Sequence, residues 1–299
     1  MTKSQAWIKA LRLRTLPLSL SGIIIGSAIA KYNGFWDWSI FLLSLLTTVL
    51  FQIVSNLAND LGDSIKGTDN KDRVGPMRSV QSGLISKNEM RNAVILTSIV
   101  SLLSAGTLIY IGTTNLPISI LWFYCGLAVA CIIAAITYTM GKKAYGYYGL
   151  GDIMVFLFFG LVSVLGVYPL YAKSLDWVIL LPACSIGLLS AAVLNLNNMR
   201  DRSNDAKSGK NTLVVKIGAD WAKLYHTLLV LGGIICHVMF LVTINHPIAF
   251  IGLLPGIILM LHLQKVMKTK NPKDFDPELK KVALSTFGIA VLTAIGLVV

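Results

Sequence analysis

The chain has 299 residues and a net charge of +12, yet only 13% of its residues are charged and 55% are hydrophobic. A soluble domain carries about 25% charged residues, so this composition, with a mean hydropathy of +0.71, excludes an ordinary soluble protein. It indicates an all-α, polytopic membrane protein. No change in composition divides the chain, so residues 1–299 are expected to form a single transmembrane domain.

Nine apolar segments are each near the roughly 20 residues that a membrane-spanning helix needs. In chain order they cover about residues 16–32, 39–58, 92–112, 117–138, 152–171, 177–197, 222–244, 247–264 and 282–299. Their number predicts that the two chain termini lie on opposite sides of the membrane.

Basic residues lie almost entirely on one side of these predicted spans. That side holds 24 of the 26 Lys and Arg residues and leaves only Lys31 and Lys173 on the other. Such asymmetry follows the positive-inside rule. It predicts a multi-pass protein of the cell (inner) membrane with a cytoplasmic N-terminus and an outside C-terminus. The net positive charge therefore reflects the orientation of the protein in its partner, the lipid bilayer, and binding of nucleic acid is excluded.

Two short polar runs interrupt the apolar pattern, each at the basic end of a predicted span. An Asn-x3-Asp spacing occurs in both, 138 residues apart, as Asn59-x3-Asp63 and Asn197-x3-Asp201. Carboxylates are costly near a bilayer, so their default interpretation there is functional. The alternative is that these side chains cap helix ends, but two matched runs on one membrane face favour a shared site.

The spacing of these runs predicts a magnesium site. Residues four apart lie on one face of a helix, so Asn59 points with Asp63, and Asp201 points with Asp205. Such oxygen ligands suit Mg²⁺, which prefers carboxylates, waters and phosphate oxygens. The expected Mg²⁺ ligands are Asn59, Asp60, Asp63, Asp69, Asn198, Asp201 and Asp205. For Asp60, exposure to water outside the site is an equally open alternative.

Basic residues in the same loops are expected to neutralise a diphosphate. Arg does so with a bidentate fork and Lys as a point charge. These residues are Lys66, Arg73, Arg78, Arg200, Lys207 and Lys210.

A third polar segment, residues 138–152, contains four tyrosines in a basic loop. They form an interfacial aromatic belt, or one or two of them line the cavity and face a developing carbocation, because aromatic faces attract cations. Tyr138, Tyr145 and Lys142 are the candidates for substrate binding. The histidines show no ligand spacing and are expected to pack as polar residues.

Together these motifs resemble the UbiA superfamily of intramembrane prenyltransferases over nearly the whole chain. The similar stretches are Arg12-x-Arg14-Thr15-Leu16-Pro17, Asn59-x3-Asp63, Asp201-x3-Asp205 and the segment from Tyr138 to Asp152. Residues 55–83 are most similar to the branch that prenylates 1,4-dihydroxy-2-naphthoate. The benzoate-prenylating branch has an Asp where this chain has Gly67, and it is open whether Asp69 or Asp72 completes the metal site.

The resemblance implies an Mg²⁺-dependent transfer of a polyprenyl group from polyprenyl diphosphate to 1,4-dihydroxy-2-naphthoate. CO₂ is lost and demethylmenaquinone is formed, as in menaquinone biosynthesis. The implied catalytic residues are Asp63, Asp201, Lys66, Arg73 and Tyr145. The implied substrate-binding residues are Asn59, Lys66, Arg73, Arg78, Lys142, Tyr138, Tyr145, Lys207 and Lys210.

Two alternatives remain. One is a related enzyme that acts on 4-hydroxybenzoate, homogentisate or a haem acceptor. The other, from a different class, is a secondary transporter, which would place its binding site near the middle of the membrane. In this chain the ionisable residues cluster at the cytosolic ends of the spans.

Overall fold

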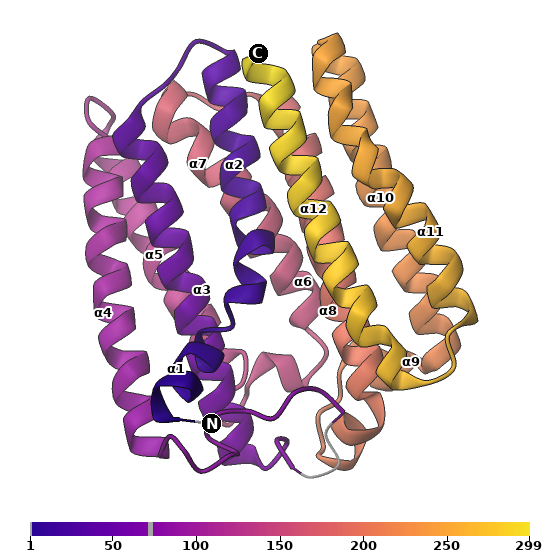
Figure 1. Cartoon of the computed structure of the whole chain (residues 1–299). Coiled ribbons are helices and arrows are strands. Elements are labelled where there is room, and N and C mark those ends of the chain that lie inside the picture. The colour runs from indigo at the N-terminus through magenta and orange to yellow at the C-terminus, as the bar shows by residue number, and fades with distance from the viewer. Residues whose placement is uncertain (1, 71–73) are drawn as a thin grey trace.

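The computed structural model describes residues 2–70 and 74–299, and these residues form helices without any β-strand. Nine helical segments of the described chain are long and apolar enough to cross a membrane, which confirms the predicted all-α, nine-span architecture (Figure 1). The helices are α1 (Lys3–Leu11), α2 (Leu16–Tyr32), α3 (Trp38–Lys66), α4 (Lys87–Gly112), α5 (Ile118–Thr137), α6 (Gly151–Val155), α7 (Ser163–Ala172), α8 (Leu180–Lys207), α9 (Leu213–Ile217), α10 (Ala219–Ile244), α11 (Leu254–Lys268) and α12 (Phe275–Val298). A π-helical turn, Phe156–Val162, joins α6 to α7 within one span.

Helices α3 and α8 continue past the boundaries that hydropathy predicted. Helix α3 ends at Lys66 rather than near residue 58, and α8 ends at Lys207 rather than near residue 197. Helix α3 stops where Gly67 adopts a left-handed backbone with φ of 74°, which glycine accepts without a Cβ clash. Both polar runs therefore lie on regular helix, and the loops after them begin later than predicted.

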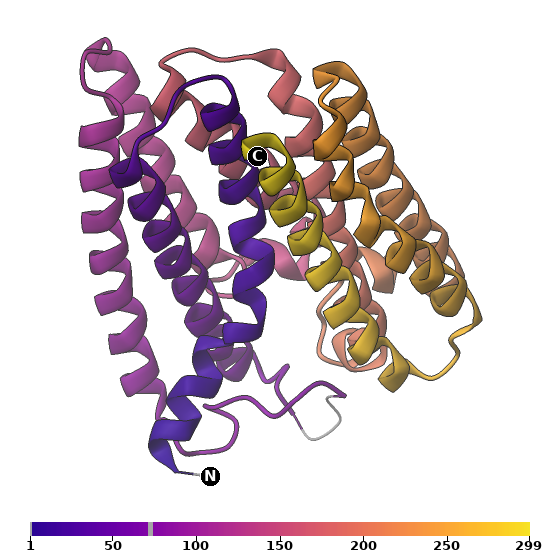
Figure 2. The same cartoon turned by 45° about the horizontal axis from the view of Figure 1, so that its top comes forward.

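Helix α8 has the most neighbours in the bundle, packing against α10, α12 and the π-helical turn, while α2 packs against α7 and α12. Helices α3, α4 and α5 pack together on one side, and Figures 1 and 2 show α10 and α11 on the opposite side. The two termini lie at opposite ends of the molecule in Figure 1. This placement agrees with an odd number of spans.

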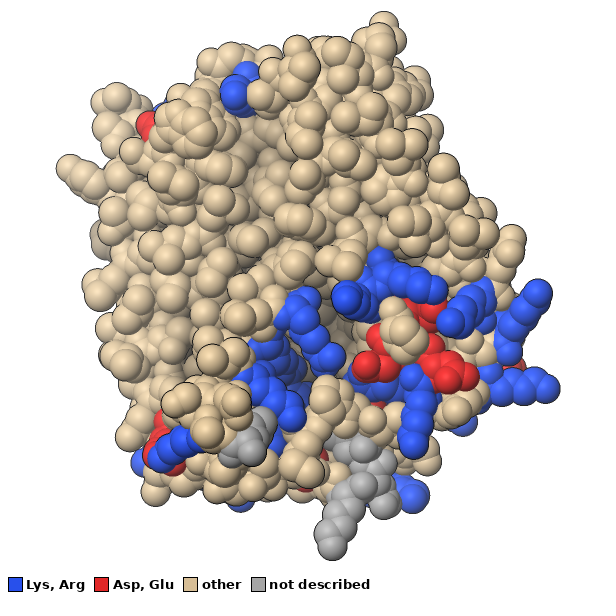
Figure 3. Space-filling view, viewed as in Figure 1, with Lys and Arg blue, Asp and Glu red and all other residues tan. Residues whose placement is uncertain are grey.

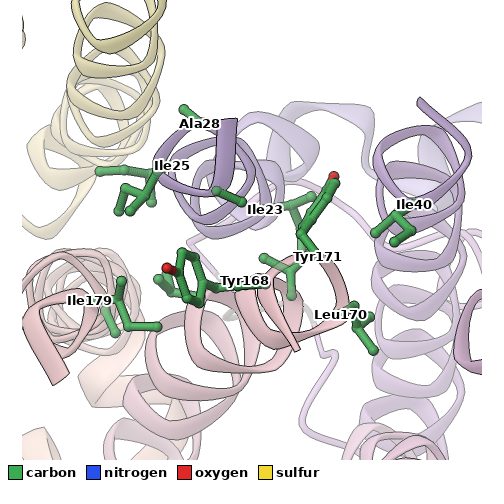
Figure 4. Close-up of a cluster of buried hydrophobic side chains, with 14 of the residues drawn as sticks. Ile23, Ile25, Ala28, Ile40, Tyr168, Leu170, Tyr171 and Ile179 are labelled. Carbon is green, nitrogen blue, oxygen red and sulfur yellow. The ribbon is translucent and has the colours of Figure 1, made fainter. Parts of the chain in front are cut away.

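The largest apolar cluster includes the contact between α2 and α7. Figure 4 shows Ile23 and Ile25 of α2 beside Tyr168 and Tyr171 of α7. The buried Tyr171 hydroxyl is satisfied, because it donates to Ser27 Oγ at 3.0 Å. This packing fixes the half of the bundle that is remote from the polar runs.

The outer helices expose large apolar side chains. Leu103 on α4 and Trp122 on α5 are 68% and 67% exposed, and Ile257 on α11 is 63% exposed. Extensive apolar patches are rare on soluble monomers, whereas lipid tails solvate them. The structure is therefore that of a multi-pass membrane protein.

Glycine lets the fifth span approach α8 closely. A Cβ added at Gly160 would lie 2.6 Å from the Ala183 carbonyl oxygen and 2.6 Å from the Gly187 Cα atom. Small residues allow such close backbone contact between membrane helices. This contact holds the span that follows the tyrosine-rich loop directly against α8, which carries the second polar run.

A buried polar network ties α10 and α11 to α12. His226 Nε2 lies 2.8 Å from His262 Nε2, and His262 Nδ1 lies 2.7 Å from Glu278 Oε2. The other Glu278 oxygen accepts from Lys281 at 2.8 Å and lies 3.2 Å from Lys265 Nζ. The prediction of polar packing is confirmed for these two histidines.

Candidate active site

The two polar runs lie at the same end of the bundle, near the C-terminal ends of α3 and α8. Figure 3 shows basic and acidic side chains gathered around a hollow at this end, while most of the remaining face is uncharged. Charge thus collects at one membrane boundary. This distribution disfavours a secondary transporter with its site at the midplane.

Direct hydrogen bonds join the loop after α3 to the end of α8. Asn204 Nδ2 donates to the Thr68 carbonyl oxygen at 2.9 Å, and Asn70 Nδ2 donates to Ser208 Oγ at 3.3 Å. The structure thereby brings together two runs that are far apart in sequence.

Asp63 is the central carboxylate of the first run. It is only 4% exposed, and its Oδ1 accepts a hydrogen bond of 2.9 Å from the Tyr147 hydroxyl. Arg78 Nη2 lies 3.7 Å from Asp63 Oδ2, and Arg78 Nε lies 3.7 Å from Asp69 Oδ1. One guanidinium therefore lies beside both carboxylates, which places Asp69 close to the first polar run.

Asn59 is positioned by the loop that follows α5. Thr139 Oγ1 donates to the Ala58 carbonyl oxygen at 3.1 Å and lies 3.3 Å from Asn59 Oδ1. A Cβ added at Gly62 would lie 2.4 Å from Thr139 Oγ1, so glycine is required for this contact. The tyrosine-rich segment thus starts directly against the first run.

The two carboxylates of the second run have different partners. Lys210 Nζ lies 3.9 Å from Asp205 Oδ1. Arg200 binds Asp201 in bidentate fashion, with N–O distances of 3.1 and 2.7 Å, and also pairs with Asp276 of α12. Arg200 is therefore buried on helix α8 beside these carboxylates, so its predicted place in the loop is wrong, while its contact with a diphosphate stays a prediction.

Lys210 connects the two halves electrostatically. Its burial opposes the charged form, but the carboxylates of Asp63 and Asp205 outweigh that effect and hold the pKa of Lys210 above its ordinary value of 10.5. The ammonium is consequently charged at neutral pH and suited to an anionic ligand.

Asp60 points into a different contact. It is 1% exposed, and its Oδ2 and Oδ1 accept hydrogen bonds from the backbone N–H groups of Ser79 and Val80, at 3.0 and 3.2 Å. It is neither hydrated nor aligned with Asp63, since both oxygens hold the loop before α4. We therefore leave Asp60 out of the metal site proposed below.

Two of the three candidates in the tyrosine-rich segment, Tyr138 and Tyr145, contact each other but differ in their other partners. The Tyr145 hydroxyl donates to the Ala134 carbonyl oxygen at 2.8 Å, and its ring packs edge-to-face on Tyr138 with centroids 5.3 Å apart. Burial raises the pKa of Tyr138 to about 12; the nearby Lys210 ammonium lowers this pKa by a smaller amount, and the Asp63 carboxylate raises it. Tyr145 thus supports the fold through its hydroxyl, whereas Tyr138 lies near the charged residues of the site.

Tyr147 was not singled out by the sequence, because spacing does not distinguish it from the other tyrosines of the segment. It is 8% exposed, and its ring lies under Lys66 Nζ at 4.0 Å and Lys210 Nζ at 5.5 Å from the centroid. It therefore contacts cations from both halves of the site.

The remaining predicted residues are exposed or lie outside the described part of the chain. Lys142 and Lys207 are exposed. Arg73 and Asp72 fall outside the described residues.

The donor atoms at this end suit Mg²⁺. In residues 2–70 and 74–299, no three Asp, Glu, His or Cys side chains form a ready-made metal site, but Mg²⁺ often uses one or two carboxylates with waters and substrate phosphates. Asn198 Oδ1 is buried and accepts no hydrogen bond, which costs about 1–3 kcal/mol. A hard cation would satisfy this amide oxygen, so the residues fit the metal.

The fold and the site define a class of protein: a multi-pass helical membrane protein with an acidic and basic site at one membrane boundary. Residues 19–285 match the profile of the UbiA prenyltransferase family, and the chain belongs to that family.

Several known proteins are similar to the chain. Two are named 1,4-dihydroxy-2-naphthoate octaprenyltransferase. The Escherichia coli protein is 40% identical over 99% of this chain and 96% of its own. The Haemophilus influenzae protein is 42% identical over 99% of this chain and 97% of its own.

Solved structures support the fold. An apo UbiA homolog from Aeropyrum pernix has a TM-score of 0.70 at 15% identity and covers 95% of this chain and 97% of its own. A UbiA homolog from Archaeoglobus fulgidus bound to DMAPP and Mg²⁺ has a TM-score of 0.59 at 15% identity and covers 95% and 99%.

Proposed function

We propose that this protein transfers a polyprenyl group from polyprenyl diphosphate to 1,4-dihydroxy-2-naphthoate, with loss of CO₂, giving demethylmenaquinone for menaquinone biosynthesis. The observation that carries this proposal is the full-length similarity, at 40% and 42% identity, to two proteins named for this acceptor. The meeting of acidic and basic residues at the ends of α3 and α8 supports it, because a diphosphate donor needs such a site.

The diphosphate binds where the two halves meet. Lys66, Arg78 and Lys210 supply cationic groups beside Asp63. The residues that would hold Mg²⁺ are Asn59, Asp63, Asp69, Asn198, Asp201 and Asp205. When bound there, Mg²⁺ would supply charge neutralisation to the departing diphosphate. The lysines and Arg78 add to this stabilisation of the leaving group.

The transfer balances without an external acid or base. The allylic C–O bond breaks and its electron pair leaves with the diphosphate. A new C–C bond forms at the carboxyl-bearing ring carbon, and the ring–carboxylate bond then breaks to release CO₂ and restore the aromatic ring. The immediate product keeps both ring hydroxyls and is the reduced, quinol form of demethylmenaquinone. Exclusion of water protects the cation-like allylic carbon.

We propose that Tyr138 and Lys142 bind the aromatic acceptor substrate. Because the pKa of Tyr138 is raised to about 12 by burial, its ring stays neutral and offers an electron-rich face to the allylic cation. Tyr145 supports that ring through its edge-to-face contact.

The proposed orientation places the active site and the N-terminus in the cytoplasm and the C-terminus outside the inner membrane. Its support is the concentration of basic residues at the site's end of the bundle (Figure 3), which the positive-inside rule assigns to the cytoplasm.

Acceptor competition tests the proposal. Purified protein with Mg²⁺ and polyprenyl diphosphate is offered 1,4-dihydroxy-2-naphthoate, 4-hydroxybenzoate, homogentisate and haem together. We expect the naphthoate to receive nearly all of the prenyl label. Preference for another acceptor would overturn the assignment, and substrate flux across liposomes without product would indicate a transporter.

A further inference from the structure

A single buried side chain, Tyr147, contacts both halves of the site, and the transfer chemistry above gives it no role. It lies in the short turn Tyr145–Tyr147 before the fifth span and is 8% exposed. Its carbonyl oxygen also accepts a 3.1 Å hydrogen bond from the backbone N–H of Asn211, in the loop after α8. Backbone and side chain together place this residue at the junction of three segments.

The hydroxyl end of Tyr147 belongs to the first half. An ionised carboxylate only accepts hydrogen bonds, so the Tyr147 O–H donates to Asp63 Oδ1 at 2.9 Å. The Thr68 hydroxyl is the other partner of the tyrosine oxygen and donates to it. This chain of hydrogen bonds gives the Asp63 carboxylate a fixed orientation.

The ring of Tyr147 contacts one lysine from each half. Lys66 Nζ, at the end of α3, lies 4.0 Å from the ring centroid, and Lys210 Nζ, in the loop after α8, lies 5.5 Å from it. The two ammonium groups carry like charges and lie close together, so they repel each other. The negative face of the ring offsets this repulsion and limits the conformations that two long, flexible side chains otherwise adopt.

We propose that Tyr147 is a positioning residue that holds Lys66 and Lys210 on its ring, and Asp63 by its hydroxyl, in the arrangement that binds a diphosphate. This inference rests on the proposed function of the site as a diphosphate site. Tyr147 acts through these three side chains and touches no reacting atom.

The ring and the hydroxyl can be separated by substitution. Tyr147→Phe keeps the aromatic face and removes the contact to Asp63. Tyr147→Leu removes both. If the ring positions the lysines, Tyr147→Leu weakens the binding of inorganic pyrophosphate about tenfold, in line with the strength of a desolvated cation–π contact, and Tyr147→Phe changes it less than threefold.

The hydroxyl is expected to act on metal binding. Tyr147→Phe should raise the Mg²⁺ concentration for half-maximal pyrophosphate binding several-fold, because Asp63 loses its orienting partner. Tyr148→Phe and Tyr148→Leu are the matched controls, since the neighbouring Tyr148 side chain is 54% exposed. Both controls should match the wild-type protein.

Binding is measured on the full-length purified protein as competition by pyrophosphate against a labelled prenyl diphosphate, alongside ligand-free thermal unfolding. Wild-type pyrophosphate affinity in Tyr147→Leu would overturn the proposal, and so would equal loss in Tyr147→Phe and Tyr147→Leu. Lower thermal stability with unchanged affinity would reduce Tyr147 to a structural residue.

A second substitution keeps the test decisive if Tyr147→Leu folds poorly. Tyr147→Met removes the aromatic ring but keeps a long, adaptable side chain that can fill the space. We expect Tyr147→Met to weaken pyrophosphate binding when Lys66 is present and to cost less affinity in a Lys66→Gln background. Additive effects would contradict action through Lys66. Failure to prenylate the naphthoate would overturn the proposed acceptor but leave these binding results interpretable.

Discussion

Asp60 and Asp63 lie one turn apart on α3, yet their environments assign them different tasks. Both carboxylate oxygens of Asp60 accept hydrogen bonds from the backbone N–H groups of Ser79 and Val80. Asp63 faces Tyr147 and the cations of the site. Helical spacing predicted that Asp63 points with Asn59, but it carries no information on which loop returns to cover Asp60.

We expect Asp60→Asn to lower stability and Asp63→Asn to lower activity. In Asp60→Asn, an NH₂ group replaces an oxygen that accepts from a backbone N–H, so two donors face each other, which costs about 1–3 kcal/mol. Turnover per folded molecule should stay within about threefold of the wild-type rate. At Asp63 the loss of a charged metal ligand should lower turnover by about 100-fold or more. Thermal unfolding and product formation measure the two effects.

The exposed Asp220, at the start of α10, provides the control, and Asp220→Asn should change neither quantity. Loss of turnover in folded Asp60→Asn, with a raised Mg²⁺ requirement, would return Asp60 to the metal site.

The charge of Lys210 gives a prediction about pH. Because Asp63 and Asp205 hold its pKa above 10.5 in the folded protein, the ammonium persists as pH rises and is lost only above that value. The ratio of pyrophosphate affinities of wild-type protein and Lys210→Met should therefore stay constant from pH 8 to pH 10. Taking a ratio cancels the titration of the ligand. A ratio that falls toward one across this range would show that Lys210 loses its proton there.

At the scale of helices, local pattern explains most of the fold. Nine spans, the shared side of the two polar runs and the Asn59–Asp63 face all follow from hydropathy and helical spacing. Hydropathy predicted the ends of α3 and α8 too early in the sequence. The polar residues of a helix that faces a polar site have the same low hydropathy as the residues of a loop. The contacts of Tyr147 with Asp63 and Lys210, and of Arg200 with Asp276, join residues distant in sequence, so no local signal could reveal them.

The network between α10, α11 and α12 predicts a stability effect far from the chemistry. Glu278→Ala removes the acceptor of His262, Lys265 and Lys281. Hydrogen bonds to charged groups contribute about 1.5–3 kcal/mol. The free energy of unfolding in detergent should therefore fall by roughly that amount in Glu278→Ala. Asp274→Ala, at an exposed acidic residue just before α12, is the control. An unchanged unfolding curve for Glu278→Ala would contradict the assigned role of this network.

For the whole molecule, nine spans place the termini at opposite ends (Figure 1), and the basic end is assigned to the cytoplasm. Alkaline phosphatase fused after Val299 should therefore be active, because the enzyme matures outside the cytoplasm. A green fluorescent protein at the same position should stay dark. The reverse pair of results would invert the orientation and place the active site outside.

The most direct test of the central claim follows two labels in one reaction. Purified protein receives Mg²⁺, polyprenyl diphosphate labelled in the prenyl group, and 1,4-dihydroxy-2-naphthoate labelled in the carboxyl carbon. We predict that labelled CO₂ and prenyl-labelled demethylmenaquinone appear in equal amounts, and that Asp63→Ala abolishes both products. Prenylated product that keeps the carboxyl label, or full turnover by Asp63→Ala, would contradict the account.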